Sequence, residues 1–187
     1  MNVLLLYGTT EGQTGKIARF VTERLVQDGQ KALMIEARES AFIPDLGEFD
    51  AVLIAASLHA GRFQREVIEF VKHNRQALAE KSSALLSVSL SAAGRDPQDV
   101  VGLATCVAQF IEQTGWTPGR VHHVAGALRY SAYGLITRWV MRHIAARRGA
   151  PTDTRRDYEL TDWQDLARFI DEFAATSGVT AAARPAQ

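Results

Sequence analysis

The sequence has one cysteine, no excess of either charge and no long hydrophobic run. The single cysteine, Cys106, excludes an internal disulfide framework and is typical of a reducing cytoplasm. Basic and acidic residues number 21 each, so the overall charge does not indicate a nucleic acid partner. The longest apolar runs, at residues 51–57 and 84–90, are far below the roughly 20 residues that cross a bilayer. We therefore expect a cytoplasmic protein with neither a transmembrane helix nor a signal peptide.

The sequence does contain a regular alternation of apolar runs and helical patterns. Five runs are predicted to form buried strands, at residues 2–7, 32–37, 51–57, 84–90 and 120–128. Four helices are predicted, at residues 15–28, 65–78, 96–115 and 161–173. This alternation predicts an α/β fold with a parallel sheet covered by helices on both faces. We expect a single domain over residues 1–175, followed by a flexible tail at 176–187.

Local signals indicate where two of these helices begin and end. Asp96 followed by Pro97 is typical of a helix N-terminus, and Gly115 is typical of a helix end. The stretch Thr161-Asp162-Trp163-Gln164 has the form of a capping box at the start of the last helix. Cys106 falls within a helical pattern that includes Val100, where a small buried residue is expected.

Residues 129–160 form a connection much longer than the roughly two to six residues usual in α/β units, so they are interpreted as an insertion. A helical pattern within it, at about residues 135–148, combines an apolar arc with Arg138 and Arg142. Such a composition is typical of a helix that lies on an anionic membrane surface. The alternative is that the apolar arc packs against the edge of the sheet.

The loop from Gly8 to Thr14, between the first strand and the first helix, is short and polar. A loop in this position directs several backbone N–H groups and the positive end of the helix toward one point, which makes an anion site. Thr9, Thr10 and Thr14 add hydroxyl donors, and Gly12 allows a ligand to approach closely. The loop lacks both the Gly-Lys-Ser/Thr ending of nucleoside triphosphate loops and the glycine spacing of dinucleotide sites.

The pattern Leu5-Leu6-Tyr7-x-Thr9-x-x-Gly12-x-Thr14-x-x-x-Ala18-x-x-Val21 resembles the flavodoxin signature. The resemblance implies a flavodoxin-like, doubly wound sheet of five parallel strands in the order 2-1-3-4-5, with the insertion after the fifth strand. It also implies that the loop binds the phosphate of FMN through main-chain amides and hydroxyls. Glu11 stands where flavodoxins often have threonine, so we expect its amide to face the phosphate and its carboxylate to point outward.

Further FMN contacts are expected from the loops after the third and fourth strands, beside the topological switch point. The candidate cofactor-binding residues are Thr9, Thr10, Glu11, Gly12, Gln13, Thr14, Ser57, Leu58, His59, Ala60, Gly61, Ser89, Leu90, Ser91, Ala92, Ala93 and Gly94. Carrier flavodoxins usually enclose the flavin ring between aromatic side chains, and His59 is the only ring in these two strand-end loops. The flavin is therefore expected to be open on one face, which suits a substrate.

His59 is also the candidate catalytic residue, because histidine ordinarily titrates near neutral pH and can move protons. The alternative is an exposed loop histidine without a catalytic role.

A second resemblance covers about residues 2–173. It is carried by Gly126-Ala127-Leu128-Arg129-Tyr130, the arginine-rich insertion, Thr152-Asp153-Thr154-Arg155 and Tyr158…Thr161-Asp162-Trp163. The chain in these respects is similar to the quinone-dependent protoporphyrinogen dehydrogenases of bacterial haem synthesis. The resemblance implies FMN-dependent oxidation of protoporphyrinogen IX to protoporphyrin IX, with a membrane quinone (menaquinone or ubiquinone) as the acceptor. The sequence departs from the family at residues 129–133, where a proline and more basic residues are expected.

The implied substrate carries two propionates, for which arginine offers a bidentate fork. Arg129 is the first candidate because it follows the fifth strand, and Arg138 and Arg142 are alternatives; each could instead belong to a solvated basic face. Tyr130 and Tyr133 are further candidates for covering the flavin or contacting the substrate or quinone. A membrane quinone implies peripheral contact with the cytoplasmic face of the inner membrane.

Two other functions remain open at this stage. One is an NAD(P)H:quinone reductase, although no nicotinamide site is recognisable, and the other is a non-enzymatic electron carrier, which the neutral charge and the insertion disfavour. No metal site is predicted, because the five histidines lack ligand spacing and the neighbours His122 and His123 would face opposite ways in a strand. The sequence does not distinguish a monomer from a homo-oligomer.

Overall fold

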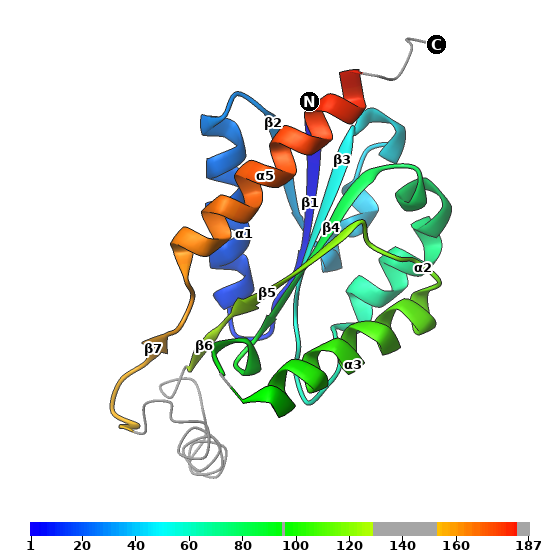
Figure 1. Cartoon of the computed structure of the whole chain (residues 1–187). Helices are drawn as coiled ribbons and strands as arrows, with labels where there is room; N and C mark the ends of the chain where they lie inside the picture. The colour runs from blue at the N-terminus through cyan, green and yellow to red at the C-terminus, as the bar shows by residue number, and fades with distance from the viewer. Residues whose placement is uncertain (95, 129–152, 183–187) are drawn as a thin grey trace.

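The structure, a computed structural model, describes residues 1–94, 96–128 and 153–182. Its centre is a sheet of five parallel strands in the order β2-β1-β3-β4-β5, which confirms the predicted topology (Figure 1). The strands are β1 (Asn2–Gly8), β2 (Lys31–Glu36), β3 (Ala51–Ser57), β4 (Ser82–Ser89) and β5 (Arg120–Ala125).

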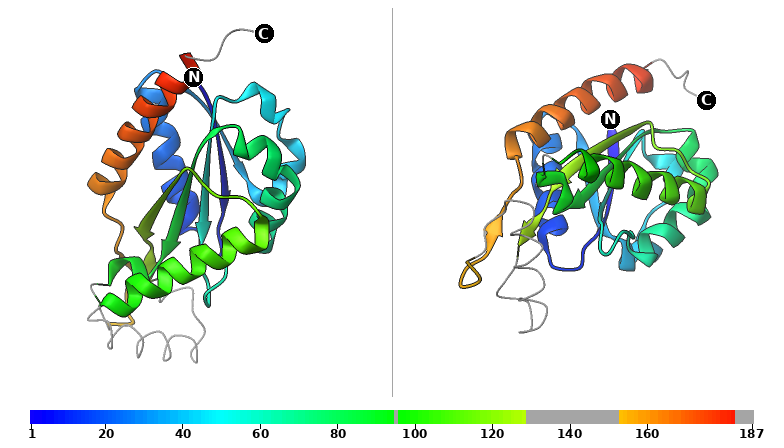
Figure 2. Two further views of the ribbon diagram at one scale, coloured as in Figure 1. Left: turned by 45° about the vertical axis from the view of Figure 1, so that its right-hand side comes forward. Right: turned by 60° about the horizontal axis from the view of Figure 1, so that its bottom comes forward.

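Helices cover both faces of the sheet, as Figure 2 shows. The helices α1 (Gln13–Gln27) and α5 (Trp163–Ala182) lie on one face, and α2 (Arg65–Ala79) and α3 (Pro97–Thr114) lie on the other. Short 3₁₀ helices, η1 (Ala37–Phe42) and η2 (Leu46–Glu48), connect β2 to β3, and η3 (Ser91–Ala93) follows β4.

Two hydrophobic cores explain why the central strands are apolar along their whole length. Val3 and Leu5 of β1 pack under α1 and α5, whereas Leu4 and Leu6 pack toward α2 and α3. Successive side chains of a strand point to opposite faces, so a strand covered on both sides needs apolar residues at every position. All four of these side chains are fully buried.

The predicted fifth strand is shorter than expected, because the chain leaves the main sheet at Gly126. The Gly126 amide still donates to the Ser89 carbonyl at 3.0 Å, but its own carbonyl accepts from the Leu160 amide at 3.0 Å. Beyond it, β6 (Ala127–Leu128) pairs antiparallel with β7 (Tyr158–Glu159) in a separate two-stranded sheet. The end of β5 is thus tied to the segment that enters α5.

The last helix also differs from the expectation at both ends. Asp162, not Thr161, caps it: the Asp162 carboxylate accepts from the amides of Gln164 at 3.1 Å and Asp165 at 2.9 Å. At the other end α5 continues to Ala182, into the stretch 176–187 that was expected to be a flexible tail. Ser177 holds this part in place, because it is buried and its hydroxyl lies 2.7 Å from that of Ser82 in β4. In the described part of the chain, no helix combines the length and apolarity of a membrane span.

Candidate functional site

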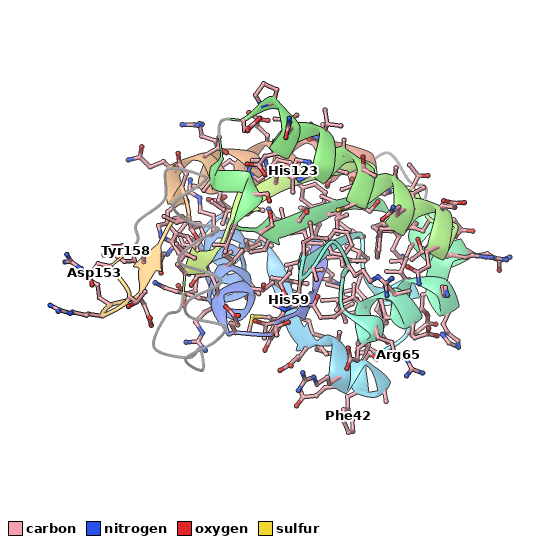
Figure 3. All side chains as sticks on the ribbon, turned by 90° about the horizontal axis from the view of Figure 1, so that it is seen from below. Phe42, His59, Arg65, His123, Asp153 and Tyr158 are labelled. Carbon is pink, nitrogen blue, oxygen red and sulfur yellow. The ribbon has the colours of Figure 1, made fainter. Side chains whose placement is uncertain are left out.

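The loops at the carboxyl ends of β1, β3 and β4 meet at one edge of the sheet, seen from below in Figure 3. Together with the first half of α3 they line a cavity of about 810 Å³. Small-molecule sites have volumes of roughly 300–1,000 Å³. In this strand order the direction of winding reverses between β1 and β3, which is where open α/β sheets bind their ligands.

The cavity brings together most of the residues proposed from the sequence. Its lining includes Thr9, Thr10, Glu11, Gln13, Thr14, Ser57, Leu58, His59, Ala60, Gly61, Ser89, Leu90 and Ser91. The lining does not include Gly12, Ala92, Ala93 or Gly94. That the lining residues contact a cofactor stays a prediction, as does the outward direction of the Glu11 carboxylate.

The first loop has the geometry of an anion site. Gly12 has φ of +89°, which favours glycine, and its amide donates to Thr9 Oγ1 at 2.9 Å. The first backbone bond of α1 runs from the Lys16 amide to the Gly12 carbonyl at 3.1 Å, so the amides of the preceding turn have no partner within the helix. Thr14 is 1% exposed and lies in this turn. Amides and hydroxyls are thus directed into one end of the cavity without a lysine among them.

Gln64, which the sequence reasoning missed, joins this loop to the end of β3. Its side-chain amide donates to Thr10 Oγ1 at 3.3 Å and to Ser57 Oγ, and these two hydroxyls lie 3.5 Å apart. Gly8 makes room for this arrangement, because a Cβ there would lie 2.6 Å from Val67 Cγ2 and 2.9 Å from Gln64 Oε1. The position of Gln64 directly before α2 is the only sequence signal for this role.

His59 lies exposed in a tight turn after β3 (Figure 3). The backbones of His59 and Arg62 exchange two hydrogen bonds, of 2.9 and 3.0 Å. The two residues between them, Ala60 and Gly61, have φ of +49° and +79°. A left-handed conformation is costly for alanine, so Ala60 is a strained residue in the wall of the cavity.

The first half of α3 forms a wall that the sequence analysis did not anticipate. The residues that it contributes to the cavity are Asp96, Gln98, Asp99, Gly102, Leu103 and Cys106. Leu103, Val107 and Phe110 face the sheet, whereas Val100 is 63% exposed. The expectation of a buried Cys106 is therefore wrong: it is half-buried and borders the cavity. The apolar spacing of Leu103, Val107 and Phe110 was the signal that could have given this orientation.

Two acidic residues give this wall its charge. Asp96 caps α3, as predicted, with its carboxylate accepting from the Gln98 amide at 2.8 Å. Asp99 lies against Gly94, where an added Cβ would be 2.3 Å from Asp99 Oδ2. A side chain at position 94 would thus require the Asp99 carboxylate to move, although Gly94 does not line the cavity.

The chain that returns to α5 docks on the first turn of α1. Lys16 pairs with Glu159 at 2.5 Å, and Glu159 also accepts from the Trp163 indole at 2.8 Å. The Lys16 hydrogen bond lowers the pKa of the Glu159 carboxyl below its ordinary value. Lys16 is thus directed toward β7.

The proposed substrate and quinone residues Arg129, Tyr130, Tyr133, Arg138 and Arg142, and the expected helix at 135–148, lie outside the described residues. Within the described ranges, no group of three or more histidine, cysteine and acidic side chains is placed to hold a metal ion. His122 stacks on Phe169, with ring centroids 4.4 Å apart, and burial lowers the pKa of its imidazole. The neighbouring His123 side chain is exposed.

Comparison with known protein families and sequences gives consistent results. The flavodoxin-domain family matches residues 4–155. A protein named protoporphyrinogen IX dehydrogenase [quinone] from Escherichia coli K12 is 33% identical over 175 residues, which cover 93% of this chain and 95% of the relative. A protein of the same name from Leishmania major is 30% identical over 172 residues, which cover 92% of this chain and 74% of the relative.

Solved structures support the fold alone. A mutant flavodoxin from Pseudomonas aeruginosa superposes with a TM-score of 0.55 at 15% identity, covering 95% of this chain and 99% of the flavodoxin. A Fusobacterium nucleatum flavodoxin bound to flavin mononucleotide superposes with a TM-score of 0.51 at 10% identity, covering 96% and 98% of the two chains.

Proposed function

Because the chain belongs to the quinone-dependent protoporphyrinogen IX dehydrogenase family, oxidoreductases with a flavodoxin domain, we propose that it oxidises protoporphyrinogen IX with FMN as cofactor and a quinone as final acceptor. The observation that carries the proposal is the 33% identity over 93% of this chain and 95% of the Escherichia coli relative. A flavodoxin domain is a flavin-binding domain, and the choice of FMN among flavins is part of the proposal.

The residues present fit a flavin with a single terminal phosphate. The first turn of α1 would hold the phosphate through the amides of Gln13 and Thr14, with the hydroxyls of Thr9, Thr10 and Thr14 as further donors. The strand-end loops 57–61 and 89–91 would flank the ring, and neither supplies an aromatic side chain apart from His59. A bound flavin would accept two electrons and a proton at a time, and the second proton of each pair would pass to the protein or to water. The oxidation of protoporphyrinogen IX to protoporphyrin IX removes six electrons, so it would take three such rounds and three quinones.

The chain's own residues bind, orient and shield the reactants. The hydrogen-bonded cluster of Gln64, Thr10 and Ser57 fixes the phosphate loop relative to the loop after β3. The tight turn around Ala60 fixes the place of His59, which is the proposed group for accepting or relaying protons. Leu58 and Leu103 add apolar side chains to the lining of the cavity.

Anaerobic turnover tests the proposal. Purified protein loaded with FMN should convert protoporphyrinogen IX to fluorescent protoporphyrin IX when menaquinone or ubiquinone is added, with one quinone reduced for each pair of electrons. Protein without flavin is the matched control. A fully loaded protein that forms no porphyrin would contradict the proposal, and rapid quinone reduction by NADH or NADPH would favour a nicotinamide-dependent reductase.

The proposed acceptor also suggests where the protein works. Because menaquinone and ubiquinone dissolve in the bilayer, the reaction requires peripheral contact with the cytoplasmic face of the inner membrane. The arginine-rich segment around Arg138 and Arg142 is the proposed contact.

A further inference from the structure

A second cavity, of about 500 Å³, lies beside the cofactor cavity between α2 and α3. The two cavities share the lining residues Gly61 and Cys106. The two cavities are therefore neighbours on either side of these two residues. None of the residues proposed from the sequence for substrate binding belongs to this second cavity.

The floor of this second cavity contains two buried aromatic rings. Phe63 and Phe110 line it and are 6% and 2% exposed, with ring centroids 5.0 Å apart in an edge-to-face arrangement. Ile68 adds an aliphatic surface. The apolar part of a ligand fits such a floor, because burial of apolar surface drives its binding.

The rim of the second cavity carries two exposed arginines, Arg62 and Arg65. Neither has an ion-pair partner within 4 Å among the described residues, although Glu69, one turn after Arg65 on α2, also lines the cavity. In Figure 3, Arg65 lies on the α2 side of His59, at the same carboxyl edge of the sheet. The two guanidinium groups are thus placed next to the cofactor cavity, and no carboxylate in the described part of the chain forms an ion pair with either of them.

The two cavities differ in charge, and this difference gives an orientation to an anionic ligand. Among the described residues, the carboxylates that line the cofactor cavity are those of Glu11, Asp96 and Asp99, and no lysine or arginine belongs to that lining. The charged residues that line the second cavity are two arginines, Arg62 and Arg65, and one glutamate, Glu69. A molecule with carboxylates at one end would be attracted to the rim formed by Arg62 and Arg65.

We propose that this second cavity is the carboxylate-binding subsite of the substrate, with Arg62 and Arg65 receiving the two propionates. This proposal rests on the proposed function. Arg62 and Arg65 take the place of Arg129, Arg138 and Arg142, which were the candidates from the sequence. Protoporphyrinogen IX carries its propionates on adjacent pyrrole rings, so both can reach one rim while the rest of the macrocycle extends past Gly61 toward the flavin. Arginine suits this task because its planar fork binds a carboxylate through two parallel hydrogen bonds.

The test compares the diacid with its dimethyl ester, which keeps the macrocycle and removes both negative charges. In the double variant Arg62→Gln/Arg65→Gln, KM for protoporphyrinogen IX should rise about tenfold or more, as expected when charged hydrogen bonds are lost. Its kcat, its affinity for FMN and its KM for the ester should stay at the wild-type values. The matched control is Arg19→Gln/Arg75→Gln, which removes the same charge from exposed positions outside both cavities. Arg62→Lys/Arg65→Lys should keep part of the preference for the diacid.

Binding without turnover separates this inference from the proposed function. Quenching of porphyrin fluorescence should show that protoporphyrin IX binds to the wild type more tightly than its dimethyl ester does, and that the double glutamine variant binds the two alike. Equal binding of diacid and ester to the wild type would overturn the subsite, whatever the protein oxidises. So would a diacid preference that survives in a double glutamine variant with wild-type thermal stability, since the arginines would then be solvated surface residues.

Discussion

The Gln13 side-chain amide donates a 3.0 Å hydrogen bond to Thr161 Oγ1, although the two residues are 148 positions apart. The same hydroxyl donates to the Ala125 carbonyl at 2.7 Å. One threonine therefore connects three parts of the cofactor edge: the first turn of α1, the end of β5 and the segment that enters α5. The proposed phosphate loop is held in place by a residue from the far end of the chain.

Replacing Thr161 with valine should destabilise both the fold and the site. The substitution keeps the side-chain volume but leaves the Ala125 carbonyl without its donor, at a cost of about 1–3 kcal/mol in the free energy of unfolding. FMN affinity should fall as well, because the first turn of α1 loses its anchor. Urea denaturation and flavin titration measure the two effects. Thr105→Val is the control and should have little effect, because the Thr105 hydroxyl donates to the Val101 carbonyl of its own helix.

Thr14→Val should weaken FMN binding by roughly 1–3 kcal/mol, the usual range for a hydrogen bond to a charged group. Thr14→Ser, which keeps the hydroxyl, should bind FMN nearly as well as the wild type. Quenching of flavin fluorescence gives both affinities. Equal affinities of the valine and serine variants would remove this hydroxyl from the proposed phosphate site.

His59→Asn should change the pH dependence of turnover if His59 accepts or relays a proton. One limb of the pH–rate profile should disappear, because asparagine cannot accept a proton, and FMN affinity should stay unchanged. Profiles of kcat and kcat/KM for wild type and variant make the comparison. Superimposable profiles would leave His59 as an exposed residue of the turn.

The ion pair of Lys16 and Glu159 should contribute to stability in a pH-dependent way. The folded protein lowers the pKa of Glu159 below its ordinary value near 4.5. The stabilisation is therefore complete above about pH 4.5 and is lost as the pH falls through the folded pKa. Because both side chains are partly exposed, we expect less than about 1 kcal/mol between wild type and Lys16→Met at pH 7. Urea midpoints between pH 3 and 7 should converge at the acid end; a constant difference would contradict this account.

Arg138→Glu with Arg142→Glu should reduce binding to anionic vesicles. At about 1 kcal/mol for each basic residue near the surface, two charge reversals weaken association by well over tenfold. Sedimentation with vesicles at low and high salt measures the change. If the variant sediments like the wild type, this segment does not contact the membrane.

The sequence by itself determined the parts of this protein that depend on neighbouring residues. Continuous apolar runs indicated doubly covered strands, Asp96 and Pro97 indicated a helix start, and the threonine-rich loop indicated an anion site at the start of α1. These signals are reliable because a cap, a turn or a periodic face is formed by residues a few positions apart. The flavodoxin signature then supplied the strand order that the structure confirms.

Only the tertiary structure decided which side chains meet across the fold. The meeting of α3 with the strand-end loops, which places Cys106 and Asp99 at the cavity, depends on packing of the helix against the sheet. Thr161 was expected as a helix cap, but it binds Ala125 and Gln13 because β5 ends beside α1. Arg62 and Arg65 gained a proposed role only when α2 and α3 were found to enclose a second cavity. Such contacts join residues far apart in the chain, and periodicity along a sequence carries no information about them.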